Sequence, residues 1–553
     1  MARHAAGPEA TTLQGELPAG ELEALLAAFR AYEAALMTND LDVLDDSFAP
    51  GDATLRGDAG GLLVGHARIS AFRGLRGGVA RRAITAVHVR VVSPDAALVV
   101  SVSEFAAGGS GLQTQLWQRV DGRWVIGAAH VTGAAPAINR AVWRVVGAPL
   151  VAASPAAEPG AGAEPGVAAD AGAGAEAVAR PLAGMTVAVK DLFEVAGFAV
   201  GAGNPEYLAG ASVATADADA VAALRAAGAA VQGIAQTDEF AYSIAGRNRH
   251  YGTPPNPAMP GALPGGSSSG PAAAVALGQA SIGLATDTAG SIRVPASYQG
   301  LWGIRTSHGA VSTRGLLPLA PTFDTIGWLA RSAATLRAAA TVSFAGAPGE
   351  TPVDVTARLE PRFVVAPELL EGCDADVVQA FDEFVGAGEA ALGGIDRVEL
   401  GGLDEVFAAF RAVQGAEAWR SDGEWVTAHP DALGADVAER FAIAAAVTGE
   451  QEAAGRKVLR KARKRFDAAL GGRVLLLPSA SSAAPPLNAS AAELGAVRAA
   501  TLRMTAVAGA GGYPAVSAPL LAVPTAGGLA PLGLCFVGPR GSDLALIELA
   551  ASV

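Results

Sequence analysis

The residues most able to do chemistry in this chain are two serine clusters on glycine-rich turns. The first, GGSSSG, occupies residues 265–270, and the second, TDTAGS, occupies residues 286–291. The small apolar run at 271–280 predicts a helix with proline in its first turn, directly after the first cluster. The second cluster can bring successive backbone N–H groups round a tight turn, which suits a developing oxyanion. These turns therefore predict nucleophilic chemistry at a serine.

A serine nucleophile needs a base, and the sequence limits the choice. None of the seven histidines lies within residues 263–295, so the usual serine–histidine pair is disfavoured, and lysine is the known substitute. Lys190 ends the β-type run at 185–189, where burial would favour loss of its proton. The lysines of the GRKVLRKARKR stretch instead predict a solvated helical surface.

Two plainer explanations of the glycine–serine run are weaker. A flexible linker would not have apolar, regular flanks. A phosphate-binding loop would be followed by Gly-Lys-Ser/Thr, which the sequence lacks here.

Lys190, GGSSSG and TDTAGSIRVP occur in the order that resembles the amidase signature family of Ser-Ser-Lys hydrolases. The resemblance extends from about residue 181 to the C-terminus. Within the family, the stretches at 238–243, 250–254 and 307–312 resemble the plant indole-3-acetamide amidases and the related chloroplast-envelope receptor.

The resemblance implies a role for each member of a triad. Ser291 is implied as the nucleophile, Ser267 as a bridging serine on a cis peptide bond, and Lys190 as the base. Neutral Lys190 would take a proton from Ser267, which takes one from Ser291 as it attacks the amide carbonyl. A serine suits the bridge because its hydroxyl donates one hydrogen bond while accepting another.

The resemblance also implies an oxyanion hole made by the N–H groups of Thr288, Ala289 and Gly290 together with that of the nucleophile. The family usually has glycine where this chain has Ala285 and Ala289. Because a β-carbon resists a turn that needs positive φ, we expect Ala289 to narrow or re-aim the hole.

The N-terminal part predicts a different domain. Apolar residues recur at helical spacing from 22 to 36, and four β-rich runs follow at 83–92, 96–105, 112–120 and 123–131. Helices followed by a curved antiparallel sheet predict an α+β cone that encloses a pocket.

This region resembles the SnoaL-like members of the NTF2-like superfamily, and more closely the small AtzH-like proteins. The resemblance implies that Arg56 binds a carboxylate in the cone and that Tyr32 supplies a hydroxyl. The residues alone equally allow Tyr32 to be a core residue and Arg56 a surface residue. A cone of this kind is also a common dimerisation module, so we expect a homodimer.

The expected organisation is a disordered tail at 1–20, an AtzH-like domain at 21–147, a flexible linker at 148–178 and an amidase domain at 179–553. The linker is almost entirely Ala, Gly, Pro and Glu, a composition that cannot support a core. For the last domain, alternating strands and helices predict a mixed sheet covered by helices.

Composition narrows the classes of partner. A net charge of −13 disfavours nucleic acid and anionic membranes, because both select a basic face. No strongly apolar run of about 18 residues occurs and the N-terminus lacks a signal peptide's apolar core, so we expect a cytoplasmic protein. The two cysteines lack metal-ligand spacing, and we expect neither a metal nor another cofactor.

The sequence therefore predicts hydrolysis of a small carboxamide to an acid and ammonia. One alternative is a hydrolase of carboxylated urea or biuret-type compounds that uses two pockets. Another is a non-catalytic docking protein on an amidase scaffold, as the envelope receptor illustrates. The presence of Lys190, Ser267 and Ser291 favours an enzyme.

Overall fold

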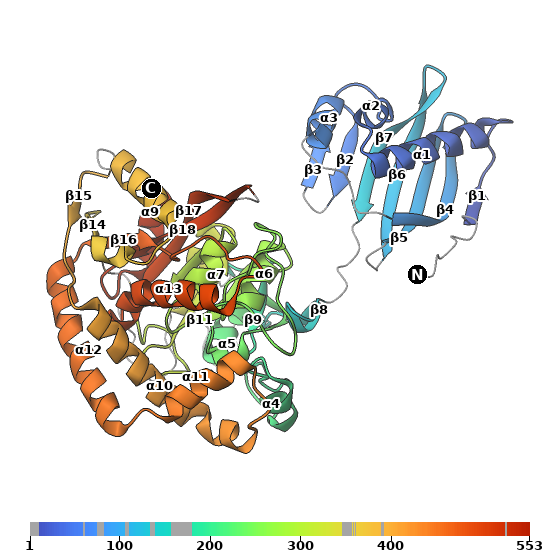
Figure 1. The fold of residues 1–553 in the computed structure, drawn as a ribbon. Coiled ribbons are helices and arrows are strands. Elements are labelled where there is room, and N and C mark those ends of the chain that lie inside the picture. Colours follow the sequence, from blue (N-terminus) through green and yellow to red (C-terminus); the bar gives the residue numbers. More distant parts are fainter. Residues whose placement is uncertain are drawn as a thin grey trace, which may run out of the picture. The chain divides into compact units, whose positions relative to one another are not determined.

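The computed structural model describes residues 10–58, 61–74, 82–105, 110–132, 139–155, 180–344, 355, 357, 359, 361–388, 392–525 and 528–553. Contacts divide the chain into two compact units, Met1–Ile138 and Asn139–Val553. Each unit has a sheet and a hydrophobic core of its own (Figure 1).

A seven-stranded sheet forms the first unit, in the order β1-β4-β5-β6-β7-β2-β3. Helix α1 lies across one face of it (Figure 1), and Leu25 and Phe29 of this helix share a buried cluster with Val99 and Trp117 of the sheet. The elements are β1 (Ala10–Gln14), α1 (Glu21–Thr38), α2 (Leu41–Asp46), β2 (Leu55–Asp58), β3 (Gly61–Val64), α3 (His66–Gly74), β4 (Arg82–Ser93), β5 (Ala96–Phe105), β6 (Ser110–Val120) and β7 (Arg123–Thr132). The four predicted β-rich runs are confirmed as β4 to β7.

Two expected boundaries are wrong. Residues Ala10–Gln14, which we expected in a disordered tail, form β1 and pair in parallel with β4. Strand β8 (Trp143–Val151) runs into the expected linker and pairs antiparallel with β10 of the second unit. Backbone pairing to another strand decides both cases, and neither short run, ATTLQ or WRVVGAPLV, carries a local sign of such a partner. The rest of the expected linker, from 156, lies outside the described residues.

An eleven-stranded mixed sheet forms the second unit, in the order β15-β14-β16-β18-β17-β12-β13-β11-β9-β10-β8. Its other strands are β9 (Thr186–Lys190), β10 (Ala230–Ala235), β11 (Ile282–Asp287), β12 (Trp302–Arg305), β13 (Thr325–Ala330), β14 (Phe363–Val365), β15 (Ile395–Arg397), β16 (Val474–Pro478), β17 (Ala515–Thr525) and β18 (Gly528–Val537). The predicted mixed sheet with helices is confirmed.

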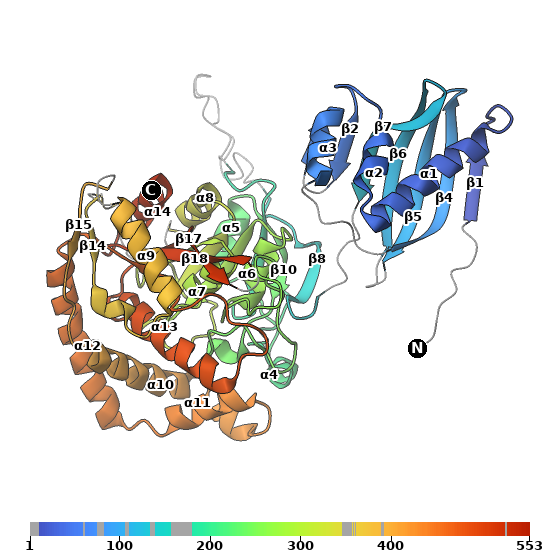
Figure 2. The ribbon, with the colours of Figure 1, turned by 45° about the horizontal axis from the view of Figure 1, so that its top comes forward.

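Helices pack around this sheet and bury two large apolar clusters. In Figure 2, α10 to α13 gather at one side of the unit. The helices are α4 (Pro205–Gly210), α5 (Asp219–Ala226), η1 (Glu239–Ala241), α6 (Ser269–Ala276), α7 (Arg293–Tyr298), α8 (Ala333–Ser343), η2 (Pro367–Leu370), α9 (Ala375–Gly388), α10 (Leu403–Ala428), α11 (Ala435–Ala445), α12 (Gly449–Leu470), α13 (Ala491–Gly511) and α14 (Asp543–Ser552).

The parallel strands of this sheet bring the serine turns and the lysine to one edge. Strand β9 pairs in parallel with both β10 and β11, so the carboxyl ends of these three strands lie together. Lys190 is the last residue of β9 and Asp287 is the last residue of β11. Open α/β sheets place their ligand sites at this edge.

Within the described ranges, no helix combines the length and the apolar character required to cross a bilayer.

Candidate active site

Lys190 is completely buried where β9 ends. Its Nζ lies 2.9 Å from Ser267 Oγ, 3.0 Å from Ser268 Oγ and 2.8 Å from Thr286 Oγ1. Burial lowers the pKa of Lys190 to about 7, although the carboxylates of Asp238, Asp287 and Asp324 oppose the shift. A substantial fraction of the amine is therefore neutral near pH 7 and can accept a proton.

Ser268 and Thr286 are contacts of the lysine that sequence reasoning missed. The Ser268 hydroxyl donates to the backbone carbonyl of Thr286 at 3.2 Å, so its own proton is engaged and it accepts from Lys190. Both residues belong to the two motifs selected from the sequence, but spacing alone does not tell which hydroxyl of a Ser-Ser-Ser run faces a strand end.

The Ser267 turn is fixed by its backbone. The peptide bond between Gly266 and Ser267 is cis. The Ser267 carbonyl accepts from the hydroxyl of Thr237 at 2.9 Å, and the hydroxyl of Ser269 donates to Asp238 at 3.1 Å. Helix α6 begins at Ser269, two residues before the start that the sequence predicted, and ends at Ala276.

Ser291 follows the end of β11, and its side chain is nearly buried, with 4% of its surface exposed. Its carbonyl accepts from the N–H of Ser268 at 3.3 Å, which holds the two serine turns against each other. Among the described residues no hydrogen bond links the hydroxyls of Ser267 and Ser291, and catalytic hydrogen bonds are often long before substrate binds.

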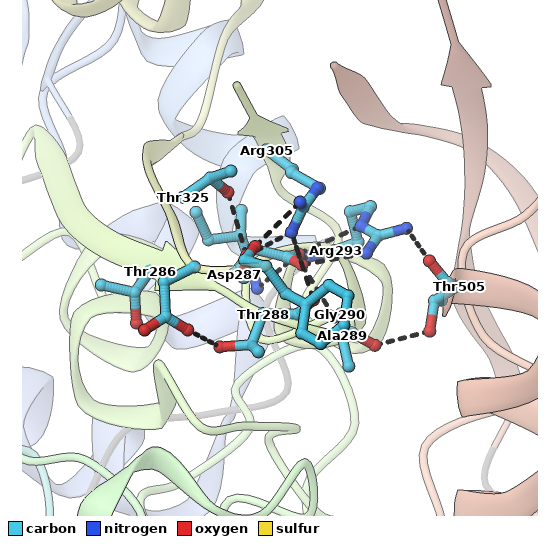
Figure 3. Close-up of polar contacts among 12 residues, drawn as sticks. Thr286, Asp287, Thr288, Ala289, Gly290, Arg293, Arg305, Thr325 and Thr505 are labelled. Atoms are coloured by element: carbon cyan, nitrogen blue, oxygen red, sulfur yellow. Dashed lines mark hydrogen bonds and ion pairs between the residues drawn. The ribbon is translucent and has the colours of Figure 1, made fainter. Parts of the chain in front are cut away.

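Asp287 organises the turn that carries Ser291. Its carboxylate accepts from Arg293 Nη2 at 2.9 Å and Nε at 3.0 Å and pairs with Arg305 Nη1 at 3.4 Å (Figure 3). All three side chains are fully buried. The two guanidinium groups hold the pKa of Asp287 well below its usual range.

One member of the expected oxyanion hole is already satisfied. The N–H of Gly290 donates to Asp287 Oδ1 at 2.8 Å, so the expectation that it serves the hole is wrong. The backbone N–H groups of Thr288, Ala289 and Ser291 have no acceptor within the part of the chain that the structure describes. These three N–H groups can donate to a ligand.

The conflict that we expected between the Ala289 β-carbon and a positive φ does not arise. The positive φ of the turn, +130°, falls on Gly290, whereas Ala289 is absent from the residues with positive φ in the described ranges. Ala285 is fully buried in an apolar cluster with Ala272 and Val275. Neither methyl group therefore strains the turn.

Thr505 of α13 supports the same turn from a distant part of the chain. Its hydroxyl donates to the carbonyl of Ala289, and its own carbonyl accepts from Arg293 Nη1 at 3.1 Å (Figure 3). Sequence reasoning missed this residue, which has no motif around it.

In the first unit, Tyr32 is a buried residue of α1, with 2% of its surface exposed. Its ring packs edge-on against Phe48 and Trp117, and its hydroxyl accepts from Arg73 Nη2 at 3.0 Å. Tyr32 thus lies in the core and also contacts a buried cation, Arg73. The sequence analysis did not select Arg73.

Arg56 is buried as well, and its guanidinium lies 4.5 Å above the ring centre of Phe72, so the surface alternative is wrong. Strand register sets Arg56, Ala129 and Gln115 in one row across β2, β7 and β6. Gln115 is fully buried, and its Nε2 has no partner among the described residues.

The described residues include no group of three or more His, Cys, Asp or Glu side chains that could hold a metal ion.

The family model described as Amidase matches residues 166–547. The chain belongs to the amidase family. Amidase 1 of Arabidopsis thaliana is 34% identical over 408 residues, which cover 67% of this chain and 93% of the relative. The protein is thus a hydrolase that acts on amide carbon–nitrogen bonds.

Three further matches add to this assignment. The AtzH-like family model matches residues 19–136. The 1-carboxybiuret hydrolase subunit AtzE of Pseudomonas sp. (strain ADP) is 38% identical over 226 residues, 40% of this chain and 48% of that relative. A solved structure described as revealing the evolutionary origins of an s-triazine catabolic enzyme superposes with a TM-score of 0.61 and 27% identity, over 67% of this chain and 83% of that one.

Proposed function

We propose that this amidase converts a small carboxamide into a carboxylic acid and ammonia through an acyl-enzyme on Ser291. Ser267 is the bridging hydroxyl and Lys190 the base. The observation that carries the proposal is the contact of 2.9 Å between Lys190 Nζ and Ser267 Oγ, made by a lysine whose pKa burial lowers to about 7.

In the proposed reaction, protons move along these three side chains. Ser291 Oγ bonds to the amide carbon while its proton passes to Ser267 Oγ, and the Ser267 proton passes to the lone pair of Lys190. The carbonyl oxygen becomes an oxyanion beside the N–H groups of Thr288, Ala289 and Ser291, each of which contributes on the order of 100- to 1000-fold in rate. The relay then returns a proton to the nitrogen as the C–N bond breaks, ammonia leaves, and water releases the acid by the reverse path.

Ammonia release tests this proposal. We expect release from at least one of indole-3-acetamide, benzamide, short aliphatic amides, biuret and carboxylated ureas by the full chain, and none above background by Ser291→Ala. Ser552→Ala, an exposed serine at the C-terminus, controls for the substitution itself. Equal release by Ser291→Ala and the unaltered chain would reject the serine mechanism.

A second candidate, the two-pocket hydrolysis of carboxylated ureas, is favoured by a specific feature of the first unit. Arg73 Nε, Gln113 Nε2 and Gln115 Nε2 are buried donors without a partner among the described residues. Arg82 and Trp117 donate to the amide oxygens of Gln113 and Gln115, which fixes the orientation of both amides. Because unpaired buried donors are costly, these groups suit a planar ligand rich in acceptor oxygens.

The two candidates make different predictions for one variant. If carboxylated ureas are processed in both pockets, Arg73→Gln loses consumption of a carboxylated urea but retains ammonia release from a simple carboxamide. If the first unit plays no part, both rates stay unchanged. The homodimer through this unit and the cytoplasmic location stay predictions from the sequence.

A further inference from the structure

A cavity of about 500 Å³ is lined mainly by residues of α10, α11 and α13 in the second unit. Figure 2 shows where these three helices lie. Its wall includes Arg411, Arg440 and Arg498, one from each helix, and a single carboxylate, that of Glu439. A neighbouring cavity of about 640 Å³ shares Arg440, Arg498 and Glu439. Cations therefore outnumber anions around the first cavity.

The protein neutralises the arginines of this cavity unequally. Arg498 makes no ion pair or hydrogen bond among the described residues, and its Nε is buried without a partner. Arg440 pairs with Asp436 at 3.0 Å and donates to the Tyr242 carbonyl at 3.1 Å. Burial and the charges of Arg440 and Arg411 lower the pKa of Arg498 to about 9, because each cation disfavours the others.

Helix α13 links this cavity to the Ser291 turn. Arg498, Leu502 and Thr505 are spaced four and three residues apart, so they lie on one face of the helix. Thr505 contacts the Ala289 carbonyl in the turn, and Leu502 and Arg498 line the cavity. At the helical rise per residue, Arg498 lies about 10 Å along the axis from Thr505.

A second segment makes the same connection from the Ser267 turn. Asp238 donates its N–H to the Ser267 carbonyl and accepts from Ser269. Four residues later, Tyr242 lines the arginine cavity. The two segments that contact the serine turns therefore both continue into the wall of the cavity.

We propose that the arginine cavity binds an anionic group of the substrate, so that the amide cleaved at Ser291 belongs to a molecule that also carries a carboxylate. This inference rests on the proposed function and names its substrate class. Guanidinium groups suit the task because they bind carboxylates in a bidentate manner. The arginine side chains reach toward the Ser291 turn, so the substrate has to cover less than the full distance along the helix. A series of ω-carboxyl amides of roughly five to nine carbons includes the chain length required.

The test compares these acids with neutral primary amides of the same length on the full chain. We expect the acids to have the lower KM. Arg498→Gln should raise their KM by roughly tenfold or more, since a charge-assisted hydrogen bond is lost, while their kcat and the kinetics of the neutral amides stay nearly constant. Arg498→Lys should recover part of the effect. No described residue bonds to or pairs with Arg498, so both variants should keep the melting temperature of the unaltered chain.

Arg420→Gln is the matched control, since it removes one arginine of α10 that pairs with Glu452 outside the cavity. A similar KM increase in this variant, or an equal effect of Arg498→Gln on acid and neutral amides, would overturn the inference while leaving the amidase proposal standing. If no amide is hydrolysed, the proposed function fails instead. Calorimetry of adipate binding to Ser291→Ala, with and without Arg498→Gln, then tests carboxylate binding by the cavity. Binding that weakens with Arg498→Gln supports the inference, and no binding overturns it.

Discussion

Lys190 Nζ lies 2.9 Å from Ser267 Oγ at the carboxyl end of β9. The contact joins a buried amine to the hydroxyl of a separate turn. That turn is held against Thr237, just after β10, and β10 runs parallel to β9 and ends beside Lys190. The pKa of about 7 that burial gives this lysine leads to the first prediction.

We expect kcat/KM to rise with pH and to level off above a midpoint near 7, because only neutral Lys190 accepts a proton. The sign follows from burial, which lowers the pKa of a cation. A pH–rate profile measured under conditions of constant folding checks this. A flat profile between about pH 6 and about pH 8 would contradict Lys190 as the base.

Ser268→Ala should move that midpoint to lower pH. Ser268 accepts a hydrogen bond from Lys190 at 3.0 Å, and a hydrogen bond to the charged form raises a pKa. Ser269→Ala is the matched control, because the Ser269 hydroxyl contacts Asp238 rather than the lysine and its removal should leave the midpoint nearer its original value. A midpoint that rises in Ser268→Ala would refute this assignment.

Asp287→Asn should lower the free energy of unfolding by about 3–5 kcal/mol, because it leaves two buried guanidinium groups without their carboxylate. Denaturant unfolding at neutral pH measures the loss. The pKa of Asp287 is depressed below its ordinary value of 3.8, so its stabilising effect is complete above that pH and is lost as the pH falls through the folded-state pKa. A variant as stable as the unaltered chain would show that the network is dispensable.

Gly290→Ala and Ala289→Gly form an informative pair. Gly290 has φ of +130°, and a β-carbon there would lie 3.2 Å from Val294 Cγ2 and 3.3 Å from Thr505 Oγ1, so we expect kcat to fall by roughly 100-fold or more as the oxyanion donors shift. Ala289→Gly should change kcat by less than about threefold, because Ala289 needs no positive φ. Steady-state kinetics on one amide measure kcat for both variants. A kcat more than tenfold higher in Ala289→Gly would show that the Ala289 methyl group obstructs the oxyanion hole.

The sequence predicted Lys190 and both serine turns because each has a local pattern: a β-type run that ends in lysine, and glycines that surround serines. It did not predict Thr505 or Arg305, which lie 216 and 18 residues from the backbone groups of the turn that they contact. Those contacts depend on the tertiary packing that brings α13 and β12 to the Ser291 turn. Likewise, no local pattern distinguishes the free N–H groups of Thr288 and Ala289 from that of Gly290, which Asp287 occupies.

The central claim is that an acyl group is carried on Ser291 and that Lys190 drives its formation. Mass spectrometry of the full chain, quenched during turnover of its best amide and digested, tests this most directly. The account predicts an acyl mass on the peptide that contains Ser291, absent in Ser291→Ala and much reduced in Lys190→Met. Turnover without an adduct on that peptide, or an adduct on another residue, would contradict it.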